Sequence, residues 1–214
     1  LDGEGNVLWL HSGICPVFDQ SYVVSGYNNI IENVTDKKAI EELSLTDRLT
    51  GMHNRRYYED NIEQVIKTAR RDEKDLTLAI LDIDFFKNYN DNYGHPAGDQ
   101  VLFEVANVFK KLLNRPTDHA MRVGGEEFCL IFTGSDRKKS IEFLEEIRGE
   151  IEALKIKHAH SDVHPYVTVS AGAVVGFGRE IPDKERLYNQ ADEALYKAKK
   201  KRNTLVVTED TRRG

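Results

Sequence analysis

The sequence predicts an α+β fold in which a central, mainly antiparallel sheet of five strands is flanked by helices. Segments with strand-like and helix-like hydrophobic periodicity alternate over most of the 214 residues. Within this alternation the pair Gly124-Gly125 separates two apolar segments, which is typical of a β-hairpin turn and requires antiparallel pairing. With 40% hydrophobic and 31% charged residues, the composition suits a soluble globular protein with a buried core.

The first part of the chain is expected to form a small β-structure followed by a helix. Residues 7–14 and 22–34 are strand-like and are joined by residues 16–20, which predicts a hairpin or a meander. Two strands alone are not stable in water, so they would need a partner. Thr35-Asp36 supplies a helix cap, and apolar residues at helical spacing follow in a linker helix that ends near residue 46.

The remaining elements follow from hydrophobic periodicity and from the positions of glycine and proline. In helix 137–156, for example, Leu144, Ile147 and Ile151 recur on one side, which indicates a face packed on the core. In chain order we expect a helix at 54–71, a strand at 76–83, helices at 85–93 and 97–113, strands at 118–123 and 127–133, the helix at 137–156, a strand at 165–175, a helix at 184–201 and a strand at 204–208.

Acidic residues lie at two strand ends that the fold could bring together. The apolar strand 76–83 leads to Asp82 and Asp84, which share one face of an extended chain, while Glu126 and Glu127 follow the Gly-Gly turn. Carboxylates from two strands and a backbone carbonyl form an oxygen-rich Mg²⁺ site that substrate phosphates complete. The alternatives are a helix cap at the Asp-x-Asp pair and a solvated hairpin tip.

Composition and charge argue against several classes of protein. The net charge of −6 argues against a nonspecific nucleic-acid binder. No apolar run approaches the roughly 20 residues of a membrane span, and no signal peptide is visible. Cys15 and Cys129 are too few and too far apart for a disulfide framework or a zinc site, so a reducing cytoplasm is the expected location. Because the chain starts at Leu1 and not at Met, we expect a fragment of a longer protein.

Five motifs occur in order between about residues 44 and 208. Together they resemble the motifs of the GGDEF family of bacterial diguanylate cyclases, and five ordered motifs are far more specific than any single one. The resemblance implies a palm-like version of the α+β fold. The motifs are Asp47–Arg56, Asp82–Lys87, Asn90–Asp99, Gly124–Phe128 and Ala191–Lys199.

The resemblance implies an enzyme that condenses two GTP molecules into cyclic di-GMP and releases two pyrophosphates. Mg²⁺, or alternatively Mn²⁺, would be the cofactor, with Asp82, Glu126 and the carbonyl of Ile83 as ligands. Glu127 would contact the metal or aid deprotonation of the ribose hydroxyl. Since each site holds one GTP, the enzyme would act as a homodimer. The alternative is a non-catalytic receptor for cyclic di-GMP or GTP, or a dimerising signalling module.

The same resemblance implies two further sets of binding residues, and each has a structural alternative. Phe85 and Phe86 would contribute backbone N–H groups at a helix start, their rings packing in the core, while Asn90 and Asp99 could instead cap helices. Asp84 is expected to be a structural residue. The implied residues are Phe85, Phe86, Lys87, Lys199 and Arg202 for the triphosphate, and Asn90 and Asp99 for guanine.

One departure from the family pattern lies at the C-terminal phosphate clamp. The family has three residues, including a glycine, between the two cationic residues, whereas only two lysines separate Lys199 from Arg202. The clamp would therefore shift to Lys197, or Arg202 would reach the phosphates differently.

Two other segments carry weaker resemblances. Arg115 and Asp118 match the family's RxxD inhibitory site for cyclic di-GMP, with a surface ion pair as the alternative. Residues 5–10 and 26–38 resemble the C-terminal end of a PAS sensor domain, with a β-extension of the main domain as the alternative. The expected organisation is a PAS-like fragment at 1–34, a linker helix at 35–46, with a short coiled coil as its expected form, and a GGDEF domain at 47–210.

Overall fold

The computed structural model of the protein describes residues 8–20, 22–35 and 45–209. The chain divides into two units, with the boundary between Ser44 and Leu45. The expected linker helix falls mostly on residues 36–44, which lie outside the described residues. None of the helices within the described ranges is long and apolar enough to cross a membrane.

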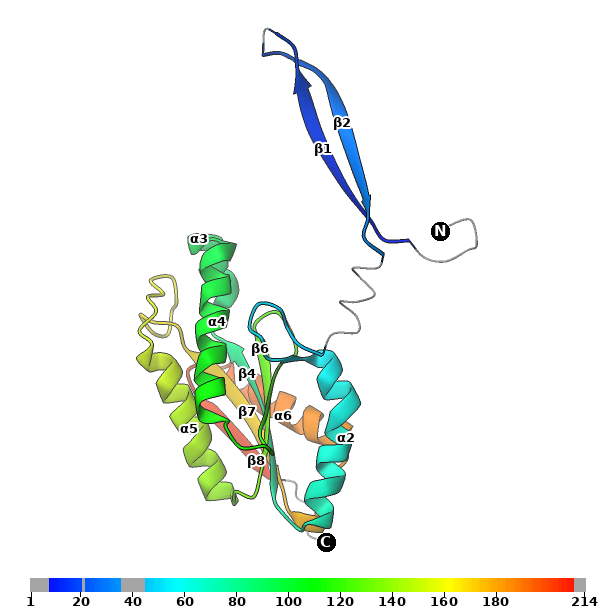
Figure 1. Ribbon diagram of the computed structural model, residues 1–214. Coiled ribbons are helices and arrows are strands. Elements are labelled where there is room, and N and C mark those ends of the chain that lie inside the picture. The colour runs from blue at the N-terminus through cyan, green and yellow to red at the C-terminus, as the bar shows by residue number, and fades with distance from the viewer. Residues whose placement is uncertain (1–7, 21, 36–44, 210–214) are drawn as a thin grey trace. The chain divides into compact units, whose positions relative to one another are not determined.

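The first unit is a two-stranded antiparallel hairpin, as expected (Figure 1). Strand β1 spans Leu10–Phe18 and strand β2 spans Val24–Asn33. The turn lies later than expected, because β1 continues through Pro16, which pairs with Tyr27, and the Asp19 side chain accepts the Val23 N–H at 3.0 Å. Apolar side chains on one face, such as Ile14 and Tyr27, are 69% and 70% exposed, so the hairpin has no core of its own.

The second unit is built on a six-stranded sheet in the order β3-β5-β6-β4-β7-β8 (Figure 1). Pairing is antiparallel for β5–β6, β6–β4 and β4–β7 and parallel for β3–β5 and β7–β8. The five expected strands are present, and β3 is an additional strand of two residues, too short to have a periodicity in the sequence. The strands are β3 His53–Asn54, β4 Leu76–Ile83, β5 His119–Arg122, β6 Glu127–Thr133, β7 Val169–Gly176 and β8 Leu205–Glu209.

Helices cover both faces of this sheet, α2 and α6 on one face and α4 and α5 on the other (Figure 1). All residues of β4 are therefore buried, and odd-numbered residues such as Leu81 contact one core while even-numbered residues such as Ile80 contact the other. The helices are α2 Arg55–Arg71, α3 Phe86–Tyr93, α4 His95–Leu112, α5 Arg137–Ala153 and α6 Lys184–Ala198, with a short 3₁₀ helix at Gly178–Glu180.

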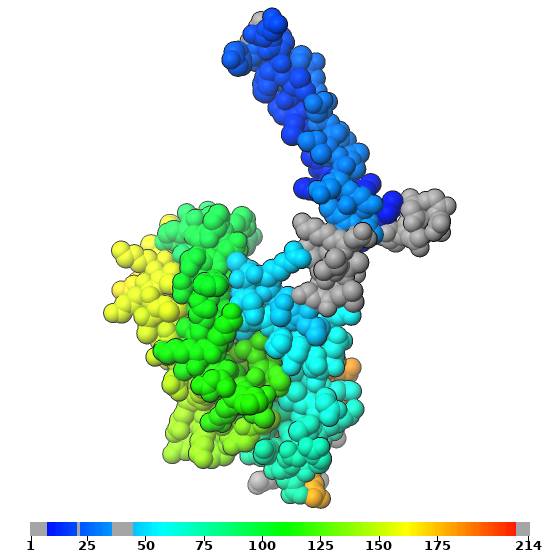
Figure 2. Space-filling view, in the orientation of Figure 1, coloured from blue at the N-terminus to red at the C-terminus, as the bar shows by residue number. Residues whose placement is uncertain are grey.

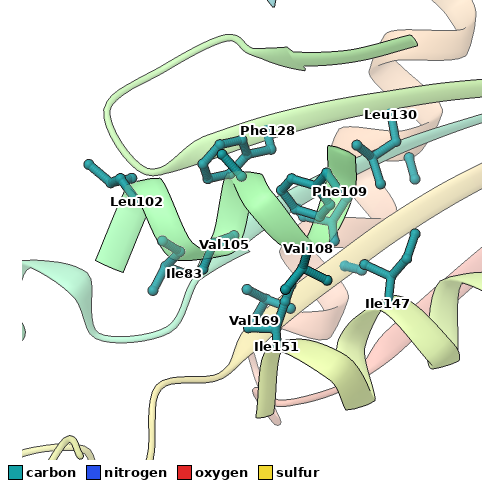
Figure 3. Packing of buried hydrophobic residues seen from close by; sticks show 14 of the residues in the cluster. Ile83, Leu102, Val105, Val108, Phe109, Phe128, Leu130, Ile147, Ile151 and Val169 are labelled. Atoms are coloured by element: carbon teal, nitrogen blue, oxygen red, sulfur yellow. The ribbon is translucent and has the colours of Figure 1, made fainter. Parts of the chain in front are cut away.

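The core beneath α4 and α5 holds the strand ends that carry the acidic residues. Figure 3 shows Phe109 of α4 beside Phe128 of β6, and their ring centroids are 5.1 Å apart. Ile83, the last residue of β4, belongs to the same cluster. The residue that follows Glu127 and the residue that follows Asp82 are thus both anchored in one core, which fixes the strand ends relative to each other.

Close packing of α6 on β7 depends on a glycine. A Cβ atom at Gly172 would lie 2.0 Å from the backbone nitrogen of Leu195 and 2.3 Å from the carbonyl oxygen of Ala191. Only glycine allows the helix to approach the strand this closely. The approach fixes the C-terminal end of α6, which leads to Lys199 and Arg202.

Candidate active site

The structure brings the acidic strand ends together. Asp82 of β4 lies directly opposite Glu127 of β6 in the antiparallel register, and the Ile83 N–H donates to the Glu126 carbonyl oxygen at 3.4 Å. Asp82 is 5% exposed, while Glu126 and Glu127 are half-buried. Directly opposed residues of an antiparallel pair project to the same side of a sheet. The two strands therefore present carboxylates to one another, so the tip is more than a solvated hairpin turn.

The Gly-Gly turn is closed by hydrogen bonds to the first residue of β6. The N–H groups of Val123 and Gly124 both donate to the Glu127 carbonyl oxygen, at 3.0 and 3.3 Å. A Cβ atom at Gly124 would lie 2.5 Å from Oε2 of Glu127, whereas a Cβ atom at Gly125 would meet nothing within 4 Å. The absence of a side chain at Gly124 therefore allows the Glu127 side chain to fold back over the turn.

An arginine that precedes the turn braces it against a distant segment. Arg122 donates from Nε and Nη2 to the Gly125 carbonyl oxygen, at 3.0 and 2.6 Å, and from Nη1 to both carboxylate oxygens of Asp47 at 3.2 Å. Asp47 also accepts from the N–H and the hydroxyl of Thr50. Burial acts to raise the pKa of Asp47, but the Thr50 hydrogen bonds and the charge of Arg122 outweigh it and hold the pKa below its usual range.

Asp82 has an unusual electrostatic environment. Burial is the largest cause that raises the pKa of its carboxyl group, to about 6, and the charges of Glu126 and Glu127 act in the same direction. The ammonium group of Lys199 opposes them, because its Nζ lies 2.5 Å from Oδ2 of Asp82. Within the described residues, no set of three or more His, Cys, Asp and Glu side chains is arranged as a metal site.

Asp84 occupies a structural position, as the sequence indicated. It is 2% exposed and accepts hydrogen bonds from the hydroxyls of Thr168 and Ser170, at 2.8 and 2.7 Å, and from the Asn203 N–H at 2.9 Å. It does not cap α3, whose N-cap residue is Phe85, without a side-chain hydrogen bond. Asp84 instead joins β4 to β7 and to the segment before β8.

The expected phosphate-binding residues gather around the start of α3. Phe85 has φ 55 and ψ 30, and the helix begins at Phe86, which is buried in the core, while Lys87 is exposed. The ring of Phe85 does not pack in the core as expected. It lies under the guanidinium group of Arg202, with Cζ 3.6 Å from the ring centroid.

The short spacing between Lys199 and Arg202 is accommodated by the backbone of Arg202 itself. Helix α6 ends at Ala198, earlier than expected, and the Arg202 N–H donates to the Ala198 carbonyl oxygen at 2.8 Å. Arg202 has φ 62, a left-handed conformation that usually falls to glycine after a helix. With this backbone, Lys199 reaches Asp82 and Arg202 reaches Phe85, whereas Lys197 is exposed.

Asn90 and Asp99 lie on the two helices that flank the Gly94 junction, and neither side chain acts as a cap. Helix α4 begins at His95 after the N-cap Gly94, so Asp99 is inside the helix and exposed. The Asn90 side-chain oxygen is buried and has no hydrogen-bond partner among the described residues. A Cβ atom at Gly98 would lie 1.8 Å from this oxygen, so Gly98 makes room for the Asn90 side chain.

Arg115 and Asp118 form a tight turn before β5, at the opposite end of the hairpin from the Gly-Gly turn. The Arg115 N–H donates to Oδ2 of Asp118 at 3.2 Å, and the Asp118 N–H donates to the Arg115 carbonyl oxygen at 3.0 Å. Both residues line a pocket of about 410 Å³ together with Lys111, Lys139 and Phe143. Oδ1 of Asp118 is buried without a partner among the described residues, and burial raises the pKa of this carboxyl group.

The contacts that sequence reasoning missed are those of Arg122. Asp47 begins one of the motifs and Arg122 lies just before another, but the sequence gave no sign that they pair across 75 positions. Two partners so far apart can be matched only when the order of the strands is known, because β3 brings residues near 53 alongside Met121 and Arg122. The local signal is an arginine two positions before the first glycine of the Gly-Gly turn.

Comparisons with known proteins agree with this architecture. Residues 44–204 match the family described as "Diguanylate cyclase, GGDEF domain". The chain is 40% identical over 158 residues to the diguanylate cyclase DgcP of Pseudomonas aeruginosa, and the aligned region covers 73% of this chain and 23% of that protein. It is 35% identical over 181 residues to the response regulator PleD of Caulobacter vibrioides, and this alignment covers 85% of this chain and 39% of that protein. The chain thus spans less than half the length of these relatives.

Solved structures lead to the same family. The coiled coil and GGDEF domain of DgcB from Caulobacter crescentus, in complex with c-di-GMP, has a TM-score of 0.70 and 31% identity, covering 81% of this chain and 90% of that one. The active GGEEF domain of a diguanylate cyclase from Vibrio cholerae has a TM-score of 0.62 and 28% identity, covering 77% and 97%. Every side chain of the site described above falls within the matched residues 44–204, and the chain belongs to the GGDEF family of diguanylate cyclases.

Proposed function

We propose that the chain is the catalytic part of a diguanylate cyclase, which condenses two GTP molecules into cyclic di-GMP and two pyrophosphates. The observation that carries the proposal is the pairing of Asp82 with Glu127 across β4 and β6, beside Glu126 and next to the start of α3. Carboxylates at this point can hold a cation between the protein and a triphosphate. Relatives named as diguanylate cyclases support the assignment.

Mg²⁺ is the proposed cofactor, with Mn²⁺ as a second cation that suits the same oxygen ligands. Asp82, Glu126 and the carbonyl of Ile83 would hold it. The site fits such a cation, since Asp82 is a buried carboxylate among negative neighbours whose counter-charge is the Lys199 ammonium group. When bound, the cation neutralises the triphosphate and stabilises charge that develops at the α-phosphate.

The protein's own groups then position the substrate. Glu127 accepts the proton of the attacking 3′-hydroxyl or adds a ligand to the cation, and its side chain is held over Gly124 for either role. The N–H groups that begin α3 bind phosphate, because they lack helical partners and lie at the positive end of the helix dipole. Lys87, Lys199 and Arg202 supply the positive charges.

Asn90 and Asp99 are proposed to select guanine. The carboxylate of Asp99 can accept hydrogen bonds from N1–H and the exocyclic amine of guanine. The buried side-chain oxygen of Asn90 has no partner among the described residues and can accept a further hydrogen bond. Adenine does not present this pair of donors and would leave the Asp99 carboxylate unsatisfied, so ATP is rejected.

The enzyme is proposed to act as a homodimer with product inhibition. Each site binds one GTP while the product contains two nucleotides, so two sites must face each other during synthesis. Cyclic di-GMP is proposed to bind at Arg115 and Asp118. The pocket there, with two further cations at Lys111 and Lys139, supports this role, because arginine can clamp phosphate and stack on guanine.

For the N-terminal unit we propose the C-terminal end of a PAS-like sensor domain at 1–34 and a signalling helix at 35–46, ahead of the GGDEF domain at 47–210. The exposed apolar side chains of the hairpin support the proposal that it packs against a partner, because two strands do not form a stable unit by themselves. The proposed location is the bacterial cytoplasm, where GTP is available.

The deciding experiment is an assay of purified chain with GTP and Mg²⁺, after bound nucleotide has been removed with a phosphodiesterase that is then itself removed. We expect cyclic di-GMP and pyrophosphate by chromatography, none with ATP, and none with a folded Glu127→Gln variant. If the chain yields no product at high protein concentration but still binds cyclic di-GMP, the proposal fails in favour of a non-catalytic receptor.

A further inference from the structure

The residue that starts the phosphate-binding helix is held in a strained conformation. Phe85 has φ 55, in the left-handed region that a residue with a side chain rarely adopts. Such a conformation costs free energy and persists only where neighbouring groups fix it. The N–H groups that follow Phe85 depend on this conformation for their direction, so whatever fixes Phe85 also fixes the phosphate-binding end of α3.

A buried histidine makes the fixing contact. His158 lies in the loop 154–168 between α5 and β7 and is 1% exposed. Its Nε2–H donates to the Phe85 carbonyl oxygen at 3.2 Å, and the same oxygen accepts the first helical N–H of α3, from Tyr89, at 2.9 Å. The carbonyl of Phe85 is therefore tied both to its own helix and to a separate loop.

The hydrogen-bonding role of the His158 ring follows from its two nitrogen atoms. Since a carbonyl oxygen only accepts, Nε2 must carry the hydrogen, and Nδ1 is buried without a partner among the described residues. Protonating Nδ1 would bury an unsatisfied N–H group. Burial correspondingly lowers the pKa of His158 below its usual value, and the ring is neutral at physiological pH.

The loop that carries His158 is fastened along α3. The ring of His158 meets Tyr89 edge to face, with centroids 5.1 Å apart, and the Ala159 N–H donates to the Tyr93 hydroxyl at 2.9 Å. The backbone N–H of His158 donates to the Pro165 carbonyl oxygen at 2.9 Å, which closes the loop on itself. Figure 2 shows this loop, in yellow, against the green surface of α3 and α4. The Ala159 and Pro165 hydrogen bonds hold the loop in place independently of the His158 side chain.

Phe85 also carries the second phosphate-binding element. Its ring supports the Arg202 guanidinium group, which is held 3.6 Å above it. One residue thus sets the direction of the α3 N–H groups through its backbone and the place of Arg202 through its ring.

We propose that His158 is a positioning residue of the triphosphate site, acting through its hydrogen bond to the Phe85 carbonyl oxygen. The inference rests on the proposed function, because it assumes that α3 and Arg202 bind the triphosphate of GTP. His158 touches no substrate in this role. Its loss should weaken the binding of the triphosphate but not that of the guanine base, which depends on Asn90 and Asp99.

The test compares two substitutions of His158 with a control on the same loop. In His158→Gln the amide nitrogen can take the place of Nε2, whereas His158→Leu keeps a similar volume without a donor. The control is His160→Ala, because His160 is exposed, lies two positions away on the same loop and contacts the ring of Tyr93 instead of Phe85. Binding of a non-hydrolysable GTP analogue and of guanosine is measured by calorimetry with Mg²⁺, and KM and kcat are measured with GTP.

For His158→Leu we expect roughly tenfold weaker binding of the GTP analogue and a similar rise in KM, with kcat and guanosine binding little changed. His158→Gln and His160→Ala should bind the analogue within about twofold of the wild type. If His158→Leu is too unstable to assay, His158→Asn replaces it, because its shorter amide cannot reach Phe85.

Two results would overturn the inference in distinguishable ways. Wild-type chain that binds no GTP analogue would remove the proposed function and this inference with it. The second result is that the wild type binds the analogue, while His158→Leu and His158→Gln either both bind it as tightly as the wild type or are both weakened equally. This result would leave the proposed function standing and exclude the positioning role.

Discussion

The substitution Asp82→Asn is expected to stabilise the metal-free fold while it abolishes activity. In the folded chain the Asp82 carboxyl group is buried next to two other carboxylates, so its pKa is raised from 3.8 to about 6. A group that binds its proton more tightly in the folded state makes folding less favourable once the pH exceeds both values. Asparagine carries no charge, so the variant does not lose the unfolding free energy that burial of the carboxylate costs the wild type.

The size of the effect follows from the pKa difference. A rise from 3.8 to about 6 corresponds to about 3 kcal/mol of unfolding free energy, and the side chain is only 7% exposed, so solvent screens little of it. The gain should be about 3 kcal/mol at pH 8 and about half of that at pH 5, where the wild-type carboxyl group is mostly protonated in the folded state. An amide that lacks a hydrogen-bond partner would reduce it by about 1 kcal/mol.

The assay is urea unfolding of both proteins in EDTA at pH 8 and pH 5, repeated at pH 8 with Mg²⁺ and GTP. Asp84→Asn is the matched control, because Asp84 lies two positions away but its side chain accepts three hydrogen bonds. We expect Asp84→Asn to be destabilised by at least about 2 kcal/mol. A loss of stability in Asp82→Asn at pH 8, or an equal change at both pH values, would refute the electrostatic reasoning.

Three other predictions concern the proposed guanine site, the fold and the proposed product inhibition. Gly98→Ala should displace the Asn90 side chain, whose oxygen lies 1.8 Å from the new Cβ position, and weaken GTP binding by roughly tenfold in calorimetry. Gly172→Ala should lower the unfolding free energy by about 3 kcal/mol in urea titrations, because its Cβ would lie 2.0 Å from the Leu195 nitrogen. Arg115→Ala should relieve product inhibition, so its progress curves with GTP should stay linear while those of the wild type bend; identical curves would count against the RxxD pocket.

The central hairpin and its neighbouring strand were the most predictable part of the fold. Strands β4 and β6 have the bounds that the sequence indicated, 76–83 and 127–133. Both are apolar runs that lie between turn residues, so the hydrophobic pattern and the positions of the turn residues indicate the same strand bounds. The proximity of Asp82 to the Gly-Gly turn could be expected from the same reasoning, since it required only that the two strands pair.

Elements that depend on distant partners were not predictable in this way. The sequence suggested that β7 begins at residue 165, yet it begins at Val169. Residues before it form the loop that holds His158, with its single bridge between Lys157 and Tyr166. The strand was predicted from a segment rich in Val, Thr and Ala, but in its first residues the contacts of the loop with α3 outweigh this local preference. His158 itself has no local pattern that would mark it as a contact of Phe85.

Arg202 shows how the backbone can accommodate a departure from a family pattern. The missing residue and missing glycine after Lys199 predicted either a shift of the clamp to Lys197 or a different reach of Arg202 to the phosphates. In the structure Arg202 stacks on the ring of Phe85 and Lys199 pairs with Asp82. Arginine itself takes the left-handed conformation, at a cost of about 1 kcal/mol, and stacking on Phe85 offsets this cost. A longer spacing would not need that strain. The position of the Arg202 guanidinium group therefore depends on the Phe85 ring as well as on backbone length, and both of the proposed phosphate-binding elements rely on Phe85.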